Sequence, residues 1–360
     1  MNSIGNIKKL FGKNFDAVLI SSIPNIIYLT GFNGFSSEER EAYLLLTTRN
    51  NYIFTDSRYS EVAEKIKDFK LIEISSAKNF GQALKDIVTL EKIKKLAVDD
   101  SNLKISEVIQ IKKAVRICPD KNVIENLRKF KSDLEIKNIK KACNLGDKTF
   151  KFILSKIKLG ITEKEIAKKI EIFILENNAE ISFRPIVAFS ENSSSPHHVS
   201  SNRKLKKNEI VLLDFGVKLD NYCSDMTRAI FFGKANNKQR QIYKTVLKAQ
   251  SKAIEILESS ILNHKSINGS EVDHVARKYI EDQGFPTIPH SLGHGIGLEV
   301  HEKPSLSVKS KDILQTGMVF SIEPGIYISD FGGVRIEDLV FIGKKGLTIM
   351  TRANRELIEL

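Results

Sequence analysis

Two segments in the second half of the chain share one pattern, in which apolar strands carry paired acids. The first segment, IVLLDFGVKLDNYCSDMTRAIFF, covers residues 210–232, and the second, MVFSIEPGIYISDFGGVRIEDLVFI, covers residues 318–342. In each, an apolar run ends in an acid, a glycine follows two residues later, and a turn leads into a second apolar run with another acid. The pattern predicts two antiparallel hairpins. Their acids are Asp214, Asp225, Glu323 and Glu337.

The turn residues predict the register of the first hairpin. Asp220 and Asn221 both tolerate the left-handed conformation that a two-residue turn requires, which places Asp225 opposite Gly216. Opposite residues share a face of the sheet, and so do residues two apart on one strand. We therefore expect the carboxylates of Asp214 and Asp225 to project from the same face.

The second hairpin is expected to behave in the same way. A five-residue loop at residues 329–333, SDFGG, would place Glu337 opposite Gly325 and on the face of Glu323. Each hairpin then presents two acids together.

Four carboxylates on apolar strands are destabilising unless cations neutralise them. Arg228 and Arg335 lie nearby in the sequence, so one acid could form a structural ion pair, but two cations do not readily serve four acids. Four carboxylates balance two divalent ions, and carboxylates with an imidazole favour Mn, Co, Fe or Zn over a thiolate-type site. Two such ions can generate hydroxide and polarise a carbonyl. The hairpins therefore predict a dinuclear metal site.

A histidine-rich segment, PHSLGHGIGLEVHEKP, lies between the two hairpins and contributes His290, His294 and His301. Its three alternating glycines oppose a helix, so a helical HExxH zinc site is excluded, and no phosphate-loop GK[ST] ending is present. His294 and His301 are seven residues apart and would face opposite ways on one continuous strand. Unless the chain bends, at most one of them binds metal directly.

A second histidine pair, His197 and His198, lies in the Ser-, Asn- and Pro-rich segment SENSSSPHHVS. Histidines in such a loop are available for chemistry, although a solvent-facing loop is an equal alternative for either one.

The first 125 residues alternate short strands with helical stretches, which indicates an α/β unit. Strands are expected at residues 15–22, 42–48, 51–56, 69–75, 92–100 and 114–120. Helical periodicity follows, with possible capping boxes at Ser132–Glu135 and Thr162–Glu165, and strands return from residue 181. We expect one domain over residues 1–127 and a second over residues 128–360.

Composition narrows the possible functions. The net charge of +12 could suggest nucleic acid, but the lysines are dispersed and no aromatic–basic, zinc-finger or RNP-type motif accompanies them. No apolar run approaches the roughly 18 residues that span a membrane, and the N-terminal segment lacks a signal-peptide core. The three dispersed cysteines form no disulfide framework. A cytoplasmic protein that binds neither membrane nor nucleic acid is expected.

The chain resembles the metal-dependent "pita-bread" peptidases, the family of methionine aminopeptidase, aminopeptidase P and prolidase. The resemblance rests on PIVAFSENSSSPHH, LLDFGVKLDNYCSDMTR, HSLGHGIGLEVHEKP, FSIEPGIYI and GGVRIEDLV in the family order. IPNIIYLTGFNG and YIFTDSRY resemble the N-terminal domain of creatinase and the proline-specific branch. The resemblance implies an α+β chain, with an α/β creatinase-like domain before a pita-bread catalytic domain.

The resemblance also implies roles for individual residues. The implied ligands of two metal ions are Asp214, Asp225, His294, Glu323 and Glu337. His197 and His301 would contact the substrate and the tetrahedral intermediate, and Glu323 would shuttle the proton. The substrate-side and orienting groups would be His290, Tyr327 and Arg335.

The implied reaction is hydrolysis of the bond between an N-terminal residue and proline, with Mn expected and Co, Fe or Zn as alternatives. Aminopeptidase P, which cleaves longer peptides, is slightly favoured over Xaa-Pro dipeptidase, and the additional N-terminal domain disfavours methionine aminopeptidase. Metal-free creatinase and a non-catalytic binding module are the alternatives from other classes, but each would be expected to lose ligands. The resemblance further implies a homodimer or homotetramer.

Overall fold

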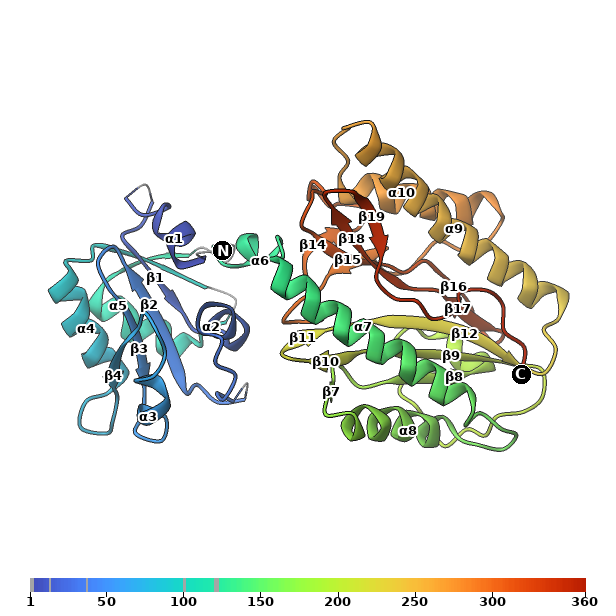
Figure 1. The fold of residues 1–360 in the computed structure, drawn as a ribbon, viewed down its shortest axis with the longest axis horizontal. Helices are drawn as coiled ribbons and strands as arrows, with labels where there is room; N and C mark the ends of the chain where they lie inside the picture. The colour runs from blue at the N-terminus through green and yellow to red at the C-terminus, as the bar shows by residue number, and fades with distance from the viewer. Residues whose placement is uncertain (1–2, 13, 37, 100–101, 120–122) are drawn as a thin grey trace. The chain divides into compact units, whose positions relative to one another are not determined.

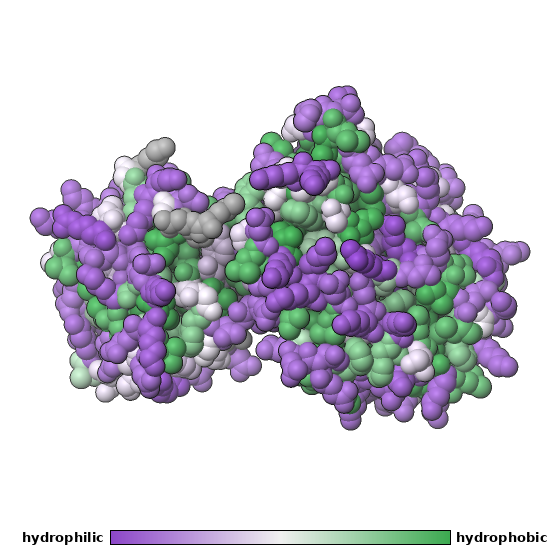
Figure 2. Space-filling view, viewed as in Figure 1, coloured by the Kyte–Doolittle hydropathy of each residue, from purple (hydrophilic) through white to green (hydrophobic). Residues whose placement is uncertain are grey.

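The computed structural model describes residues 3–12, 14–36, 38–99, 102–119 and 123–360 (Figure 1). The chain divides into two compact units, residues 1–128 and 129–360. Asp100 and Asp120, the last residues of two expected strands, lie outside the described residues. Among the described residues, no helix is both long and apolar enough to cross a membrane. Figure 2 shows hydrophilic residues over much of the visible face, with hydrophobic residues between them.

The N-terminal unit is a mixed six-stranded sheet with the strand order β4-β3-β2-β1-β5-β6. Its strands are β1 (Ala17–Ile20), β2 (Ala42–Thr47), β3 (Asn51–Thr55), β4 (Lys70–Glu73), β5 (Lys95–Val98) and β6 (Arg116–Pro119). Its helices are α1 (Ser3–Lys8), α2 (Ile23–Thr30), α3 (Ser60–Ala63), α4 (Phe80–Glu91), α5 (Ile105–Ala114) and α6 (Glu125–Arg128).

Helices cover both faces of this sheet because its strands are apolar on both sides. Alternate residues of β1 enter different cores: Val18 packs in a cluster with Ile26 of α2, whereas Leu19 packs in a cluster with Leu84 of α4. Near-continuous apolar strands of this kind are typical of an α/β sheet buried on two faces.

The C-terminal unit combines two pairs of helices with several small antiparallel sheets. Its helices are α7 (Asp133–Leu154), α8 (Glu163–Glu176), η1 (Ser190–Ser194), α9 (Asn237–Leu262) and α10 (Gly269–Asp282). Its first strands are β7 (Glu180–Ile181), β8 (Ile186–Phe189), β9 (Glu209–Phe215), β10 (Val217–Leu219), β11 (Tyr222–Cys223) and β12 (Met226–Phe232). The remaining strands are β13 (Gly293–Gly295), β14 (Glu302–Leu306), β15 (Val319–Ile322), β16 (Gly325–Ile328), β17 (Gly332–Arg335), β18 (Asp338–Gly343) and β19 (Gly346–Ile349).

Each helix pair packs on its own group of strands (Figure 1). Helices α7 and α8 share a core with β8 and β9, and α9 and α10 share a core with β15 and β18. Both expected capping boxes are confirmed: Ser132 and Glu135 open α7, and Thr162 and Glu165 open α8. These caps satisfy backbone N–H groups that the first helical turn leaves free.

The register of the first hairpin is confirmed. Asp220 and Asn221 occupy its turn with φ values of 50° and 70°. Pairing of Met226 with Phe215 on one side, and of Cys223 with Lys218 on the other, leaves Asp225 opposite Gly216. A side chain at Gly216 would approach the carbonyl oxygen of Ser224 to 2.0 Å, so only glycine fits beside the second acid.

The register expected for the second hairpin is wrong by two residues. Ile328 pairs with Gly332, so the loop has three residues rather than five. The shorter loop closes because Asp330 and Gly332 adopt positive φ values of 61° and 132°. The β15–β18 and β16–β17 pairs follow the same register. Continued between them, this register places Glu337 opposite Glu323 and not opposite Gly325. An even shift preserves the face, so the two acids still project together.

Candidate metal centre and active site

A cavity of about 330 Å³ in the C-terminal unit gathers the expected site residues. Its lining includes nine of the ten: His197, Asp214, Asp225, His290, His294, His301, Glu323, Arg335 and Glu337. The tenth, Tyr327, lies behind this lining, where its hydroxyl contacts His290 and Arg335. Segments more than one hundred residues apart in the sequence thus meet at one place.

Strand ends supply the acids. Asp214 is the penultimate residue of β9, whereas Asp225 directly precedes β12, Glu323 directly follows β15 and Glu337 directly precedes β18. At the end of a strand, the backbone still forms hydrogen bonds with the neighbouring strand, and the side chain is free to point into the cavity. His294, the central residue of the short strand β13, completes the set.

Asp225, His294 and Glu337 form a group that could hold a metal ion, since one ligand atom from each lies within 4.8 Å of the others. Nδ1 of His294 lies 3.1 Å from the carbonyl oxygen of Gly295, to which it donates. Nε2 is therefore the nitrogen that faces the acids, 3.3 Å from Glu323 Oε1 and 3.7 Å from Asp225 Oδ2. Fixing the outer nitrogen in this way is usual for histidine ligands of metals.

The acids of the cavity are incompletely satisfied by protein groups. Among the described residues, Asp214 Oδ1, Asp225 Oδ1 and Glu337 Oε1 are buried and have no hydrogen-bond partner. Burial, and then repulsion from Glu337 and Asp214, raises the pKa of Asp225 well above its usual value. Burial and the charges of Glu323 and Asp214 do the same for Glu337. Such a cluster is stabilised by added positive charge, so these residues fit divalent metal ions.

His294 responds to the same crowding. Burial opposes its protonation, but the hydrogen bond to Glu323 and the nearby carboxylates raise its pKa to about 9. A metal ion would replace that proton, because an imidazole must be neutral at the nitrogen that binds.

Among the described residues, Arg335 supplies the one guanidinium that forms an ion pair with any of the four acids, and its partner is Asp214. Its Nη2 donates to Asp214 Oδ2 at 2.6 Å, and its Nε donates to Thr227 Oγ1 at 3.0 Å. Thr227 Oγ1 in turn donates to Glu337 Oε2 at 2.8 Å. Arg335 therefore orients acids from both hairpins. Arg228, the other expected partner, pairs instead with Asp338 at 2.6 Å.

The wall beside Arg335 contains Tyr327 and His290. Arg335 Nη1 donates to the Tyr327 hydroxyl at 2.7 Å, and that hydroxyl lies 2.9 Å from His290 Nε2. His290 Nδ1 lies 2.8 Å from the Ser291 carbonyl oxygen and donates to it, so Nε2 accepts from Tyr327. Burial lowers the pKa of His290, which favours this neutral form.

His294 and His301 do not lie on one continuous strand, so the condition under which they would face opposite ways is not met. The chain bends between β13 and β14, which pair antiparallel with a register shift after His294. The two rings meet with their centroids 4.4 Å apart. The glycines allow this bend: a Cβ on Gly295 would approach the Lys303 carbonyl oxygen to 2.1 Å.

Sequence reasoning missed the ion pair that holds the segment before His290. On α10, Arg277 donates to Asp273 at 2.9 Å and also to the carbonyl oxygens of Ile288 and His290. Asp273 accepts from the backbone N–H of Leu292 at 3.1 Å. Arg277 and Asp273 thus fix the backbone on both sides of His290 by hydrogen bonds. Their spacing of four on a helix was the available signal.

The fold and the site define a pita-bread metallopeptidase with an N-terminal creatinase-like domain. Residues 137–344 match the metallopeptidase family M24, and residues 7–130 match the creatinase/prolidase N-terminal domain. The chain belongs to metallopeptidase family M24 and is a hydrolase of that family.

Named relatives match over almost the whole chain. A Xaa-Pro dipeptidase of Pyrococcus horikoshii is 37% identical over 361 residues, which cover 99% of this chain and 98% of the relative. The solved structure of a Xaa-Pro dipeptidase from Bacillus anthracis is 33% identical, covers 99% of both chains and has a TM-score of 0.90. An X-Pro aminopeptidase structure from Thermotoga maritima is 31% identical, with 98% and 99% coverage and a TM-score of 0.86.

Proposed function

We propose that the chain is a metal-dependent Xaa-Pro dipeptidase, which cleaves a dipeptide between its first residue and a C-terminal proline. The observation that carries the proposal is the grouping of Asp225, His294 and Glu337, with one ligand atom each within 4.8 Å, in a cavity walled by further histidines. We propose a dipeptidase in place of the slightly favoured aminopeptidase P. The relatives named Xaa-Pro dipeptidase match almost the whole chain and are more similar in sequence than the X-Pro aminopeptidase of Thermotoga maritima. Aminopeptidase P remains the alternative, favoured by the Thermotoga structure.

Metal ions would be held by Asp214, Asp225, His294, Glu323 and Glu337, with Mn as the proposed metal and two ions per subunit. Bound there, they would polarise the scissile carbonyl and lower the pKa of a bound water. The remaining work falls to protein side chains.

Glu323 is the proposed proton acceptor. Although burial raises its pKa, the hydrogen bond and charge of His294 lower it further, so its pKa lies below the usual value and the carboxylate is ionised. Ser321 donates to Glu323 Oε1 at 3.2 Å and fixes the side chain. A carboxylate held in this way can take a proton from the attacking water and pass it to the leaving nitrogen.

His197 and His301 are proposed to donate hydrogen bonds to the oxygen on which negative charge develops. Burial and the neighbouring charge of His294 lower the pKa of His301, which keeps a neutral imidazole with one N–H to donate. The proline nitrogen of the scissile bond has no N–H, so recognition falls on ring shape and on the carbonyl. His290 and Tyr327 are the proposed wall for the proline side.

We also propose the organisation of the whole chain. Residues 1–127 would form the creatinase-like domain and residues 128–360 the catalytic domain, in a homodimer or homotetramer.

The proposal is tested by measuring cleavage of Ala-Pro and Ala-Pro-Ala side by side. Protein purified without chelator is loaded with Mn, and its metal content is measured before the assay. Cleavage of Ala-Pro at a higher kcat/KM than Ala-Pro-Ala is expected. A preference for Ala-Pro-Ala would instead support aminopeptidase P.

Asp225→Asn is the matched negative control, since it keeps the size of the side chain and removes a proposed metal ligand. It is expected to abolish cleavage without loss of the fold. Absence of any bound or activating divalent ion in the wild-type protein would reject the enzyme reading and favour a non-catalytic binding module.

A further inference from the structure

A second buried carboxylate lies outside the cavity lining, at the start of α8. Glu163 is the first residue of that helix, and its side chain is 0% exposed. It is not one of the acids expected to bind metal, and the helix cap is made by its neighbours Thr162 and Glu165. The position near a helix N-terminus favours the ionised form of the carboxylate. The hydrogen-bond donors around its two oxygens indicate its role.

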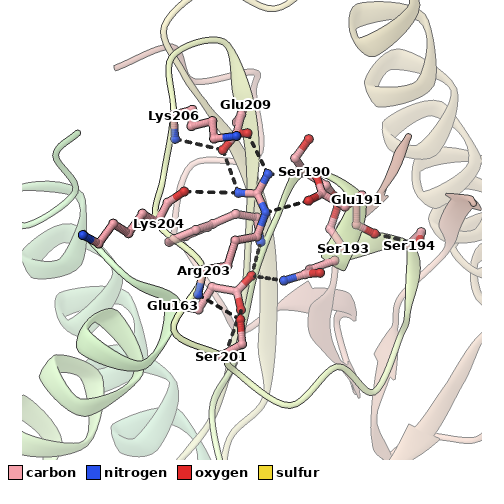
Figure 3. Close-up of polar contacts among 12 residues, drawn as sticks. Glu163, Ser190, Glu191, Ser193, Ser194, Ser201, Arg203, Lys204, Lys206 and Glu209 are labelled. Atoms are coloured by element: carbon pink, nitrogen blue, oxygen red, sulfur yellow. Dashed lines mark hydrogen bonds and ion pairs between the residues drawn. The ribbon is translucent and has the colours of Figure 1, made fainter. Parts of the chain in front are cut away.

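Both oxygens of Glu163 are saturated by one loop, residues 189–201. Oε1 accepts from the backbone N–H of Phe189 and from Asn192 Nδ2, each at 2.8 Å. Oε2 accepts from the backbone N–H and hydroxyl of Ser201, at 2.8 and 2.7 Å. The carboxylate therefore ties both ends of the loop to α8, as Figure 3 shows for the Ser201 end.

The fifth partner of Glu163 is His198, whose Nε2 lies 2.8 Å from Oε2. An ionised carboxylate only accepts hydrogen bonds, so Nε2 of His198 carries the proton. Five donors converge on two oxygens. A glutamine at this position would turn its own NH₂ group toward donors, which leaves at least one of them without an acceptor in a buried place.

The loop between the two ties carries His197 to the cavity. Residues 195–198 form a tight turn in which the backbone N–H of His198 donates to the Ser195 carbonyl oxygen at 3.2 Å, with Pro196 as its second residue. His197 is the third residue of the turn, and its side chain lines the cavity. The adjacent His198 points back to Glu163. The orientation of His197 thus depends on a turn whose last residue, His198, is anchored to Glu163.

The side chain of Arg203 forms a second bridge to the loop that does not involve the Glu163 carboxylate. Arg203 joins Glu191 of the loop to Glu209 of β9 through hydrogen bonds of 2.7 to 2.8 Å (Figure 3). Glu191 is half exposed in its side chain, so this bridge is screened by solvent. The Glu163 carboxylate, by contrast, is buried and contacts the turn itself through His198.

We propose that Glu163 is a positioning residue for His197: through His198 and the two ends of the loop, it holds the turn that presents His197 to the substrate. The proposal rests on the proposed function, in which His197 donates to the developing negative charge. Misplacement of a reacting group by about 1 Å can cost about 10²-fold in rate. A loose turn would therefore reduce kcat while leaving KM nearly unchanged.

The test is a double-mutant cycle in the Mn-loaded full chain with Ala-Pro as substrate. Glu163→Gln is expected to lower kcat by about 10- to 100-fold, and His197→Ala by a similar factor. In the His197→Ala background, Glu163→Gln should then add less than about twofold, because its effect passes through His197. An equal reduction of kcat by Glu163→Gln in both backgrounds would overturn the proposal. It would also be overturned if the kcat of Glu163→Gln or of His197→Ala alone lay within about twofold of wild type.

Glu165→Gln is the matched control, since it is the same substitution two residues further along α8 but touches only the exposed cap at Thr162. It should leave kcat unchanged. Thermal unfolding of each variant separates loss of folded protein from loss of turnover. If Glu163→Gln does not fold, His198→Ala takes its place in the cycle. This change is milder, because it removes only one of the five hydrogen bonds to Glu163 and alters a partly exposed side chain.

A readout without turnover separates this proposal from the proposed function. In metal-free protein labelled at histidine, the NMR signal of the His197 imidazole, assigned by its loss in His197→Ala, should be single and sharp in wild type and broadened or split in Glu163→Gln. An unchanged His197 signal in Glu163→Gln would overturn positioning. Failure of wild-type protein to cleave either peptide, with a changed signal, would overturn only the proposed function.

Discussion

Glu337 and Asp338 are adjacent residues with buried side chains, yet their carboxylates meet opposite environments. Glu337 faces the cavity, where Oε2 accepts from Thr227 at 2.8 Å and Oε1 is left without a partner among the described residues. Asp338 faces the opposite side. Its Oδ1 accepts from Arg228 at 2.6 Å and Thr351 at 2.5 Å, and its Oδ2 accepts from Gln250 at 3.0 Å.

The difference separates a carboxylate that stabilises the fold from one that needs an ion. Behind the strands, Asp338 has a full set of donors, as buried polar groups generally have. In the cavity, Arg335 pairs with Asp214 at 2.6 Å, but Asp225 and Glu337 have raised pKa values that reflect burial and mutual repulsion. An arrangement that is unfavourable for folding alone is what a metal centre requires.

The largest effect is expected on the cavity side. Glu337→Gln should lower kcat/KM on Ala-Pro by about 10³-fold or more, since loss of one preorganised electrostatic group already costs about 10²–10³ in turnover. The metal-free variant should unfold at the same or a higher urea concentration, because one acid leaves a crowded cluster. Steady-state kinetics and urea unfolding with chelator measure both.

Thr351→Val is the control for that change, because it removes a donor to Asp338 and leaves the cavity untouched. It should reduce stability and keep turnover. Turnover of Glu337→Gln within about tenfold of wild type would remove the distinction between the two carboxylates.

The second effect is expected on the opposite side. Arg228 also donates to the carbonyl oxygens of Glu337 and Ala353, and it is 1% exposed. Arg228→Met should lower the free energy of unfolding by about 3–5 kcal/mol, because the buried Asp338 loses its close partner and keeps only the longer ion pair with Arg355, at 3.8 Å. Adding Asp338→Leu should recover part of the loss. A double variant as unstable as the sum of two singles would show that the pair itself is not the cause.

Metal removal should act on stability through the cavity acids alone. Addition of a chelator should abolish turnover and lower the free energy of unfolding by about 2.7 kcal/mol when the free metal had been 100 times its Kd. Differential scanning calorimetry with and without Mn measures this change. Asp225→Asn should show a much smaller shift with Mn, whereas Thr351→Val should shift as wild type does.

The smallest effect concerns Glu163, a satisfied carboxylate like Asp338. Burial raises its pKa, but hydrogen bonds from Ser201, His198 and Asn192 outweigh that and lower it. A lowered pKa stabilises the fold above the unfolded-state pKa of about 4.3, and the contribution disappears as pH falls through the folded-state value. The stability difference between wild type and Glu163→Gln should therefore narrow below about pH 4. A difference that stays constant from pH 7 to pH 3 would contradict this ionisation.

Much of the site could be predicted because strand alternation is local. The two-residue turn at Asp220 and Asn221 is encoded by residues that tolerate positive φ, and the register of the first hairpin followed. In the second hairpin, the loop length was wrong by two residues, yet Glu323 and Glu337 still share a face, since an even shift preserves parity.

Contacts between distant segments could not be predicted in this way. The pairing of Arg335 with Asp214 spans 121 residues, and that of Arg228 with Asp338 spans 110. Both arginines lie near several acids in the sequence, and nothing local distinguishes the partners. The meeting of the His294 and His301 rings depended on a bend that the strand pattern did not reveal.

The sequence by itself determined which acids share a face, where α7 and α8 begin, and that the acids outnumber nearby cations. These properties depend on residues a few positions apart and on the two-residue repeat of a strand. Only the tertiary structure decided which carboxylates have donors and which face the cavity, and that Glu163 holds the loop of His197. The reason is that hydrogen-bond satisfaction is set by packing between elements, which sequence spacing does not encode.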